Sequence, residues 1–251
     1  MGVGVHGNDK IIGVIPARFD SSRLPGKPLK KIKGYPMIYW VAKQVKKSNL
    51  KKFIVATDNI KIYETCNFYN IPVKMTSSEC KNGTERVAEI SKDYDEDVWF
   101  VNIQGDEPLI NPLAINKLLI EKRTSNRFQF IQAVNLIDDL NLIEDVNTVK
   151  VLFSENKYIQ TYSRKPVQSK HDKNFYRCLG LYLYSKKFLN KFVALKPSRR
   201  ERSQNIEQLR ALDNDLKIKI CLVEDDGFSV DTMDDLKKMR KLFFKTYQLG
   251  E

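Results

Sequence analysis

In the first half of the chain, short apolar runs alternate with segments in which apolar residues have helical spacing. The apolar runs are of strand length and rich in β-branched residues; they lie at 11–17, 53–57, 72–75 and 98–103. The helical patterns cover 36–45, 59–69, 84–94 and 112–123. Strands that alternate with helices in this way form parallel β-α-β units, so the sequence predicts one open α/β sheet.

The second half of the chain is richer in strands than the first. Further runs of strand length lie at 128–136, 149–153, 178–184 and 217–223, and helices are predicted at about 201–212 and 231–247. The sequence contains no internal repeat and no linker. Residues 11–251 are therefore predicted to form a single domain with a β-rich elaboration at about 125–190, preceded by a flexible extension at 1–10.

The chain is basic, with 43 Lys and Arg against 31 Asp and Glu and a formal net charge of +12. Such a charge is found in nucleic-acid-binding proteins, but no zinc-finger, RRM or basic-zipper pattern accompanies it here. Many of the lysines recur along one predicted helix and its flanks, which is typical of a solvated surface. We therefore expect no nucleic-acid partner. Binding to DNA or RNA, with an affinity that depends on salt, ranks third among the functions considered for this chain.

Several classes of protein are disfavoured by what the sequence lacks. No apolar run reaches the roughly 18–20 residues that a membrane helix needs, and none resembles a signal peptide, so no membrane partner and no secretion are expected. The four cysteines form no C-x-x-C pair and the two histidines have no ligand spacing, which argues against zinc, dithiol and histidine metal sites. Unpatterned cysteines fit a cytoplasmic protein.

Three cations occupy the loop after the first predicted strand. Ligands of open α/β sheets bind at the carboxyl ends of strands, and this end carries Arg18, Arg23 and Lys27. Arginine presents a planar fork to phosphate oxygens, and lysine presents a mobile point charge. The loop lacks both G-x-x-x-x-G-K-[ST] and G-x-G-x-x-G, which disfavours P-loop NTPases and dinucleotide-binding dehydrogenases. A nucleoside triphosphate remains compatible with the loop.

Two aspartates are candidate ligands for a metal ion. Asp106 follows the strand at 98–103, where its carboxylate would face the cationic loop. Mg²⁺ needs only one or two protein carboxylates when phosphate oxygens and waters complete its shell. Asp231, just before the last predicted helix, is the second candidate, and its alternative role is the N-cap of that helix.

Nine short motifs occur in order along the chain. They are IPARFDSSRLPGKPL, VATDN, NGTER (82–86), VNIQGDEPLI, VKVLFS, YSR, CLGLY (178–182), IEQLR and VDT. Together they span about residues 11–245 and resemble the 3-deoxy-manno-octulosonate (Kdo) cytidylyltransferases. The resemblance implies a homodimer with a Rossmann-like open mixed sheet and helices on both faces, of the nucleotide-diphospho-sugar transferase type. It also implies that CTP and a 3-deoxy-2-ulosonate sugar acid give a CMP-sugar and pyrophosphate, with Mg²⁺, for lipopolysaccharide or capsule synthesis.

The resemblance also assigns roles to residues of this chain. For the nucleotide it implies Ala17, Arg18, Arg23, Lys27, Asn82, Gly83 and Gln104. For the sugar acid it implies Gln104, Arg164, Cys178, Glu207 and Gln208, with Arg164 as the partner of the sugar carboxylate. Asp106 and Asp231 are implied as Mg²⁺ ligands, and the catalytic set is Lys27, Arg18 and Asp106.

The chain departs from the family pattern mainly on the sugar side. Cys178 stands where the family commonly has histidine, and Cys80 and Asn82 replace histidine and serine in the segment before Thr84. We therefore predict a cytidylyltransferase for Kdo or for a modified Kdo such as 8-amino-3,8-dideoxy-manno-octulosonate. The alternatives are a nucleotidyltransferase for another acidic sugar and a non-catalytic nucleotide-sugar-binding paralogue.

Overall fold

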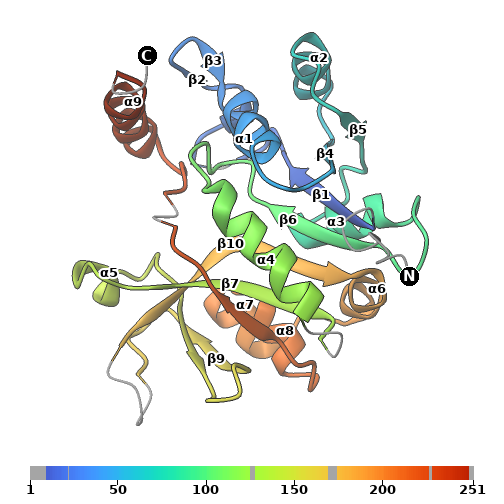
Figure 1. Ribbon diagram of the computed structural model, residues 1–251, viewed down its shortest axis with the longest axis vertical. Coiled ribbons are helices and arrows are strands. Elements are labelled where there is room, and N and C mark those ends of the chain that lie inside the picture. The colour runs from blue at the N-terminus through green and yellow to red at the C-terminus, as the bar shows by residue number, and fades with distance from the viewer. Residues whose placement is uncertain (1–9, 22, 125–127, 169–173, 226–227, 249–251) are drawn as a thin grey trace, which may run out of the picture.

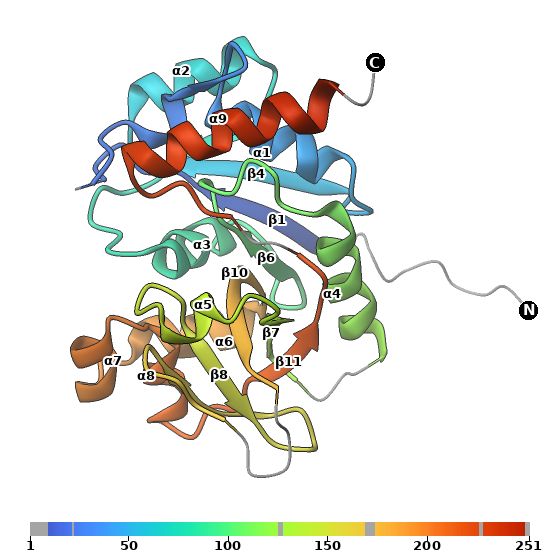
Figure 2. The same ribbon diagram turned by 90° about the vertical axis from the view of Figure 1, so that its left-hand side faces the viewer.

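The computed structural model describes residues 10–21, 23–124, 128–168, 174–225 and 228–248. Residues 1–9, and with them nearly all of the predicted N-terminal extension, lie outside the described residues. Within the described part, nine strands form one mixed sheet that crosses the middle of the molecule, with helices on both faces (Figure 1, Figure 2). The predicted fold class is confirmed.

Parallel pairing dominates the first half of the sheet, as the alternation of strands and helices predicts. The strands of the sheet are β1 (Ile11–Pro16), β4 (Lys52–Thr57), β5 (Val73–Met75), β6 (Trp99–Ile103), β7 (Phe130–Leu136), β8 (Lys150–Phe153), β9 (Ile159–Ser163), β10 (Tyr176–Ser185) and β11 (Lys219–Leu222). Their main order is β11-β7-β10-β6-β1-β4-β5, with β8 joined to β10 and β9 to β8. β1 pairs in parallel with β4 and β6, whereas β10 runs antiparallel to β6 and β7.

Both faces of the sheet are buried by helices, and β1 shows why the sequence allows this. Ile11 and Ile15 point into the core under one group of helices, which are α1 (Met37–Lys46), α2 (Ile60–Phe68) and α4 (Pro112–Thr124). Ile12 and Val14 point to the other group, which are α3 (Gly83–Ser91), α6 (Lys186–Ala194) and α8 (Gln208–Leu212). A strand that alternates its side chains between two covered faces has to be apolar at both.

The C-terminal helix α9 (Met233–Gln248) packs at the edge of this assembly, over α1 and a short hairpin of β2 (Lys31–Ile32) and β3 (Tyr35–Pro36). The ring of Phe243 lies 4.8 Å from that of Trp40, whose indole N–H donates to the carbonyl oxygen of Ile32 at 2.7 Å. This packing brings the segment before α9 back to the ends of β1 and β6. None of the described helices is long and apolar enough to span a bilayer.

The prediction of one helix at 201–212 is wrong, because two short helices occupy this part of the chain. α7 (Arg199–Gln204) ends at Asn205, whose left-handed backbone (φ 53°) turns the chain before α8 begins. α6 is not predicted from the sequence, since it follows β10 with no loop and Ser185 serves as its N-cap. Also unpredicted are β9, the β2–β3 hairpin, the 3₁₀ turn Lys27–Leu29 and the one-turn helix α5 (Asn141–Glu144).

Replacing Phe130 with Ala tests the core beneath α6. Phe130 is 1% exposed, and its ring lies 4.7 Å from that of Tyr184 and 4.8 Å from that of Phe188. The lost contacts and the resulting cavity should lower the free energy of unfolding by about 3–5 kcal/mol, measured by urea denaturation. Phe68→Ala is the matched control: Phe68 is 79% exposed, so its change should stay within about 0.5 kcal/mol. Similar losses in both variants would contradict this account of the core.

Candidate active site

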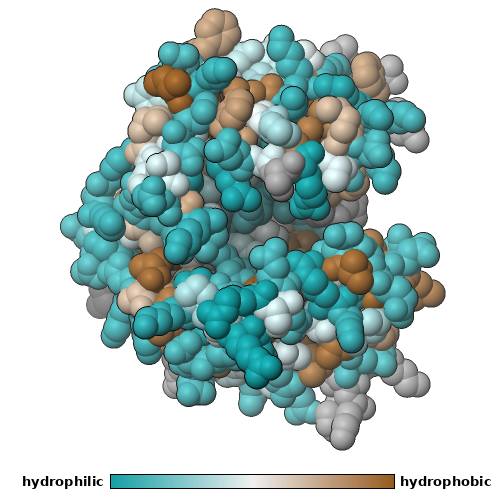
Figure 3. All heavy atoms as spheres, turned by 180° about the vertical axis from the view of Figure 1, so that it is seen from behind, coloured by the Kyte–Doolittle hydropathy of each residue, from teal (hydrophilic) through white to brown (hydrophobic). Residues whose placement is uncertain are grey.

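Two adjoining cavities open at the edge of the sheet where β1 and β6 end side by side. The smaller cavity, about 340 Å³, lies over the loop after β1 and the start of α3. The larger cavity, about 700 Å³, extends from the end of β6 to β10, the segment after α5 and the start of α9. Seen from behind, the surface is hollowed between its two ends and the rim is mostly hydrophilic (Figure 3). The residues that line both cavities include Arg23, Gln104, Asp106 and Asp231.

One ammonium group joins the two predicted metal ligands. Lys27 Nζ lies 2.6 Å from Asp106 Oδ2 and 3.0 Å from Asp231 Oδ1. Arg23 pairs with the other carboxylate oxygen of Asp231 at 3.1 Å. The backbone N–H of Val230 donates to the carbonyl oxygen of Asp106 at 2.9 Å, which holds the two acidic segments side by side. The cationic loop and both aspartates therefore converge.

The Lys27–Asp106 pair is screened from solvent, since only 14% of the Lys27 side chain and 20% of the Asp106 side chain are exposed, whereas 36% of the Asp231 side chain is exposed. Burial alone lowers the pKa of Lys27, but the two carboxylates outweigh it, and the pKa lies above its ordinary value. Burial alone raises the pKa of Asp231, but Lys27 and Arg23 together hold that pKa below its ordinary value. Lys27 and Asp231 are therefore both charged at neutral pH.

The loop after β1 folds back on itself and so directs Lys27 toward the aspartates. The backbone N–H of Gly26 donates to the carbonyl oxygen of Phe19 at 2.9 Å, and Gly26 has φ +65°. A Cβ at this position would lie 3.1 Å from the Phe19 ring, so both the backbone angle and the space favour glycine. Arg18 and Ala17 line the smaller cavity, and within the described residues the exposed Arg18 side chain has no carboxylate partner.

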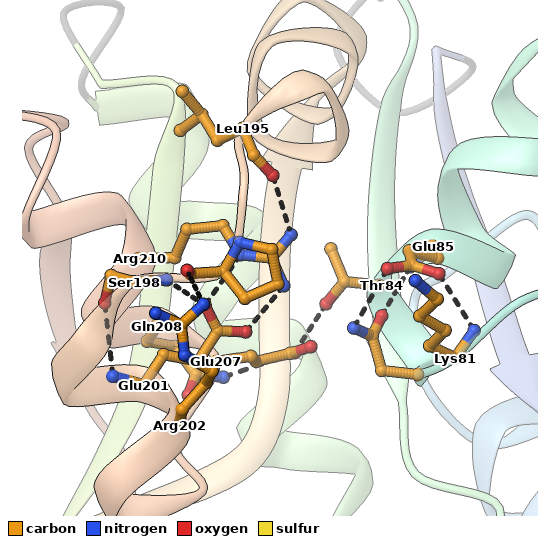
Figure 4. Close-up of polar contacts among 12 residues, drawn as sticks. Lys81, Thr84, Glu85, Leu195, Ser198, Glu201, Arg202, Glu207, Gln208 and Arg210 are labelled. Carbon is orange, nitrogen blue, oxygen red and sulfur yellow. Dashed lines mark hydrogen bonds and ion pairs between the residues drawn. The ribbon is translucent and has the colours of Figure 1, made fainter.

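The start of α3 forms the opposite wall of the smaller cavity. Asn82 Oδ1 accepts the backbone N–H of Glu85 at 2.8 Å, and the Glu85 carboxylate accepts the backbone N–H of Lys81 (Figure 4). Asparagine and serine are comparable N-caps, so asparagine in place of the family's serine preserves the helix start. The buried Arg86 pairs with Asp58 at 2.6 Å, which links the NGTER motif to VATDN.

Cys80 also lines the smaller cavity, next to the predicted nucleotide residues. Its thiol donates to Glu89 Oε2 at 3.0 Å. Burial first, and the Glu89 carboxylate second, raise the pKa of Cys80 to about 12. The thiol is therefore protonated at neutral pH and serves as a hydrogen-bond donor.

The structure brings only some of the predicted sugar residues to the larger cavity. Gln104 and Cys178 line it, while Arg164 lines neither cavity. The Arg164 guanidinium donates instead to three backbone carbonyl oxygens at 2.7–3.2 Å. Its contact with the sugar carboxylate stays a prediction.

Glu207 and Gln208 also line neither cavity; Glu207 instead joins α8 to α3. Thr84 Oγ1 donates to Glu207 Oε1 at 2.6 Å (Figure 4). The same oxygen lies 3.1 Å from Tyr184 Oη. Burial raises the pKa of Glu207 to about 7, although the bond from Thr84 and the nearby Arg210 act in the other direction. Glu207 therefore changes its charge near neutral pH. The roles of Glu207 and Gln208 toward the sugar stay predictions.

Glu107 and Arg177 line the larger cavity, although sequence reasoning does not select them. Glu107 is 6% exposed; burial first, and then the Asp106 and Asp225 carboxylates, raise its pKa to about 8. A Cβ at Gly180 would come within 2.8 Å of Glu107 Oε1, so glycine lets β10 approach the end of β6. The only sequence signal for Glu107 is its place beside Asp106, and Arg177 has none.

Asp231 does not cap α9, because Thr232 takes that role. Thr232 Oγ1 accepts the backbone N–H of Asp235 at 3.2 Å, and the Asp235 carboxylate accepts the backbone N–H of Thr232 at 2.9 Å. The carboxylate of Asp231 is left to face Lys27 and Arg23. This geometry favours the metal-ligand hypothesis over the N-cap alternative.

The position of the Lys27 ammonium shows that a cation fits between Asp106 and Asp231. Among the described residues, no group of three or more His, Cys, Asp or Glu side chains could hold a metal ion alone. A divalent ion between these two carboxylates would need oxygens from a substrate or from water to complete its shell. Mg²⁺ accepts that arrangement.

Comparison with known proteins shows which family these motifs represent. A family model described as cytidylyltransferase matches residues 12–218. The 3-deoxy-manno-octulosonate cytidylyltransferase of Leptospira interrogans is 38% identical over 96% of the chain and 99% of its own length. That of Fusobacterium nucleatum is 37% identical over 92% of the chain and 95% of its own length. The chain belongs to the 3-deoxy-manno-octulosonate cytidylyltransferase family. The resemblance inferred from the ordered motifs is confirmed.

Solved structures agree with this membership. CMP:2-keto-3-deoxy-manno-octonic acid synthetase, solved in complex with CTP, matches this cytidylyltransferase with a TM-score of 0.88 and 30% identity, over 94% of the chain and 99% of its own. The inositol-1-phosphate CTP transferase from T. maritima matches with a TM-score of 0.68 and 17% identity, over 93% of the chain and 95% of its own length. The second similarity shows a shared fold alone.

The raised pKa of Glu207 predicts how the stability of this cytidylyltransferase depends on pH. Between the ordinary pKa of 4.5 and about 7, the unfolded chain has lost a proton that the folded protein keeps. The free energy of unfolding should therefore fall as pH rises through this window. Glu207→Gln keeps an acceptor for Thr84 and removes the titration, so it should gain stability relative to the wild type between about pH 5 and about pH 8. Urea unfolding at both values measures this, and a difference that does not change with pH would contradict it.

Proposed function

We propose that the protein transfers a cytidylyl group from CTP to Kdo and releases pyrophosphate. The observation that carries this proposal is the cluster of Lys27, Asp106 and Asp231, in which Lys27 lines the smaller cavity and the two aspartates line both. Nucleotidyl transfer needs a triphosphate and an acceptor to meet at one charged point. The names of the relatives and the CTP in the related structure support this choice of substrates.

The smaller cavity suits the nucleotide. Arg18, Arg23 and Lys27 place three cations there for the triphosphate. The first turn of α3 faces the same cavity at Asn82 and Gly83, and its backbone N–H groups favour polar or negative groups. Ala17 and Gln104 complete the proposed nucleotide contacts.

We propose Mg²⁺ as the cofactor, held by Asp106 and Asp231 together with oxygens of the substrates. When bound, the ion would supply positive charge that stabilises the phosphate oxygens and lowers the pKa of the attacking hydroxyl. The carboxylate of Asp231 is ionised well below neutral pH, since ion pairs with Lys27 and Arg23 hold its pKa low. Asp231 is therefore ready to bind a cation at the pH at which the enzyme works.

The reaction is an in-line displacement at phosphorus. The anomeric 2-hydroxyl of the sugar attacks the α-phosphorus of CTP, a new P–O bond forms, and the P–O bond to the leaving pyrophosphate breaks while the hydroxyl proton passes to solvent. No protein nucleophile is needed, because catalysis depends on alignment and on charge stabilisation. Arg18 and Lys27 neutralise the charge that develops on the pyrophosphate.

Pyrophosphate release tests the proposal directly. We expect release with CTP, Kdo and Mg²⁺, and none with the other nucleoside triphosphates or after EDTA treatment. Asp106→Asn and Lys27→Ala should each lower kcat by about 10²–10³, while Lys31→Ala, an exposed lysine on β2, should not. Circular dichroism checks that each variant is folded. Near-normal turnover in either site variant would contradict the assignment, and release with a different acidic sugar alone would favour the alternative substrate class.

We also propose a modified Kdo, such as the 8-amino analogue, as the preferred acceptor. Cys178 replaces the family's histidine at the larger cavity, and burial raises its pKa to about 12, so a neutral thiol stands there. The carboxylates of Asp145 and Asp235 line the same cavity and would complement an ammonium group on the sugar. We expect kcat/KM for the 8-amino sugar to exceed that for Kdo by about tenfold, equivalent to about 1.4 kcal/mol. A preference for ordinary Kdo in the same assay would reject this part of the proposal.

The proposal also covers the oligomeric state of the protein and its cellular compartment. We place the enzyme in the cytoplasm, as a homodimer that serves lipopolysaccharide or capsule synthesis. The elaboration at 125–190 is our proposed dimer contact, supported by its exposed apolar side chains, such as Leu136 (37%) and Leu140 (74%). The non-catalytic alternative is disfavoured, because the intact cluster of Lys27, Asp106 and Asp231 would have no evident use in a binding protein.

A further inference from the structure

Lys150, in the VKVLFS motif, is wholly buried at the start of β8, and neither the fold nor the proposed chemistry accounts for its charge. Among the described residues no carboxylate lies within 4 Å of its ammonium. The ammonium instead donates to three backbone carbonyl oxygens, those of Asp145 at 2.7 Å, Thr148 at 3.0 Å and Arg164 at 2.8 Å. Two of the three belong to residues 145–149, which we call the wall segment.

The wall segment forms one side of the larger cavity. Asp145, Asn147, Thr148 and Val149 all line it. Inside the segment, the Asp145 carboxylate accepts the backbone N–H of Asn147 and the hydroxyl of Thr148, each at 2.9 Å. At its end, the carbonyl oxygen of Val149 accepts the backbone N–H of Cys178 at 3.0 Å. The position of the wall segment therefore also sets the position of Cys178.

A second cation fastens the same segment from its other side. Arg164 Nη1 donates to the carbonyl oxygen of Val146 at 2.9 Å. Its Nε and Nη2 donate to the carbonyl oxygens of Gln204 and Asn205, at 2.7 Å and 3.2 Å. Asn205 itself lines the smaller cavity. Arg164 thus ties the wall segment to the turn between α7 and α8, and Lys150 ties it to the end of β9.

Apolar packing holds the wall segment at its end, where Val149 packs against the core, and does little before that point. Val146 is 62% exposed, and α5, just before the segment, has no buried residue. In Figure 2, α5 lies below α3 in the view. Hydrogen bonds from a cation are stronger than neutral ones, and removing the donor leaves buried carbonyl oxygens without a partner. The two cations, and Lys150 above all, therefore fix this wall.

We propose that Lys150 is a positioning residue for the sugar-acid substrate: through the carbonyl oxygens of Asp145 and Thr148 it holds the wall segment where the acceptor binds, without touching the substrate. This inference rests on the proposed function, which assigns the larger cavity to the sugar. The inference predicts an effect on binding of the sugar acid and none on binding of CTP, because the wall segment lines the larger cavity and not the smaller one.

Steady-state kinetics of Lys150→Met test the proposal. Displacing a substrate-positioning segment by about 1 Å can cost on the order of 100-fold in rate. We expect a loss of that size in kcat/KM for the sugar acid, mostly through its KM, with the KM for CTP unchanged. Lys186→Met is the control: Lys186 is also buried (9% exposed) and donates to the carbonyl oxygen of Tyr94 at 2.6 Å, but it pairs with Glu96 at 3.0 Å and lines neither cavity. An unchanged sugar KM in folded Lys150→Met, or an equal rise for CTP, would overturn the inference.

Amide hydrogen exchange of the protein without substrates gives a readout that does not depend on turnover. Exchange at residues 145–149 should be faster in Lys150→Met than in the wild type and unchanged in Lys186→Met. Unchanged exchange in Lys150→Met would overturn the role of Lys150 even if the enzyme makes CMP-Kdo. A wild type that turns over no sugar acid would instead reject the proposed function, while the exchange data still decide whether Lys150 holds the wall. If Lys150→Met does not fold, Lys150→Gln, which keeps two N–H donors on a shorter side chain, replaces it, and smaller changes in the same direction are expected.

Discussion

The ammonium of Lys27 is the contact on which the proposed site depends. Two carboxylates that share a small space repel each other unless a cation lies between them. Lys27 supplies that cation in the free protein, and in doing so it joins the loop after β1, the end of β6 and the segment before α9. A metal ion that binds between the same two carboxylates would take the place of this ammonium, so the proposed function requires Lys27 to turn toward the phosphates when substrates bind.

The degree of burial explains why one strand is predicted from the sequence and another is missed. β1 is predicted because both of its faces are buried, whereas β9 is missed because only Ile159 and Tyr162 of its five residues are buried. The convergence of Lys27, Asp106 and Asp231 follows from their places at strand and helix ends. The present contacts of Arg164 do not follow from the sequence, because its acceptors are backbone carbonyl oxygens, and any residue type can supply these.

Some cationic side chains of this protein donate hydrogen bonds to its own backbone. Lys150, Lys186 and Arg240 all donate to carbonyl oxygens of distant segments or loops. Carbonyl groups at the ends of strands and in loops lack the partners that a helix or sheet would give them, and a long cationic side chain can reach several at once. A surplus of lysine and arginine in a chain of this kind therefore reflects the bonding of its loops as well as its anionic substrates.

The place of β10 in the sheet has a consequence for how the protein is made. β10 (Tyr176–Ser185) lies between β6 and β7, both of which precede it in the chain. While the ribosome is still translating the middle of the message, β6 has no neighbour on that side and β7 has no partner toward the centre. Such open strand edges are prone to pair with other chains. The nascent enzyme should therefore rely on chaperones until Ser185 has left the ribosomal tunnel and β10 joins β6 to β7. Both cavities are completed only later, when Asp231, which lines both, has also been translated.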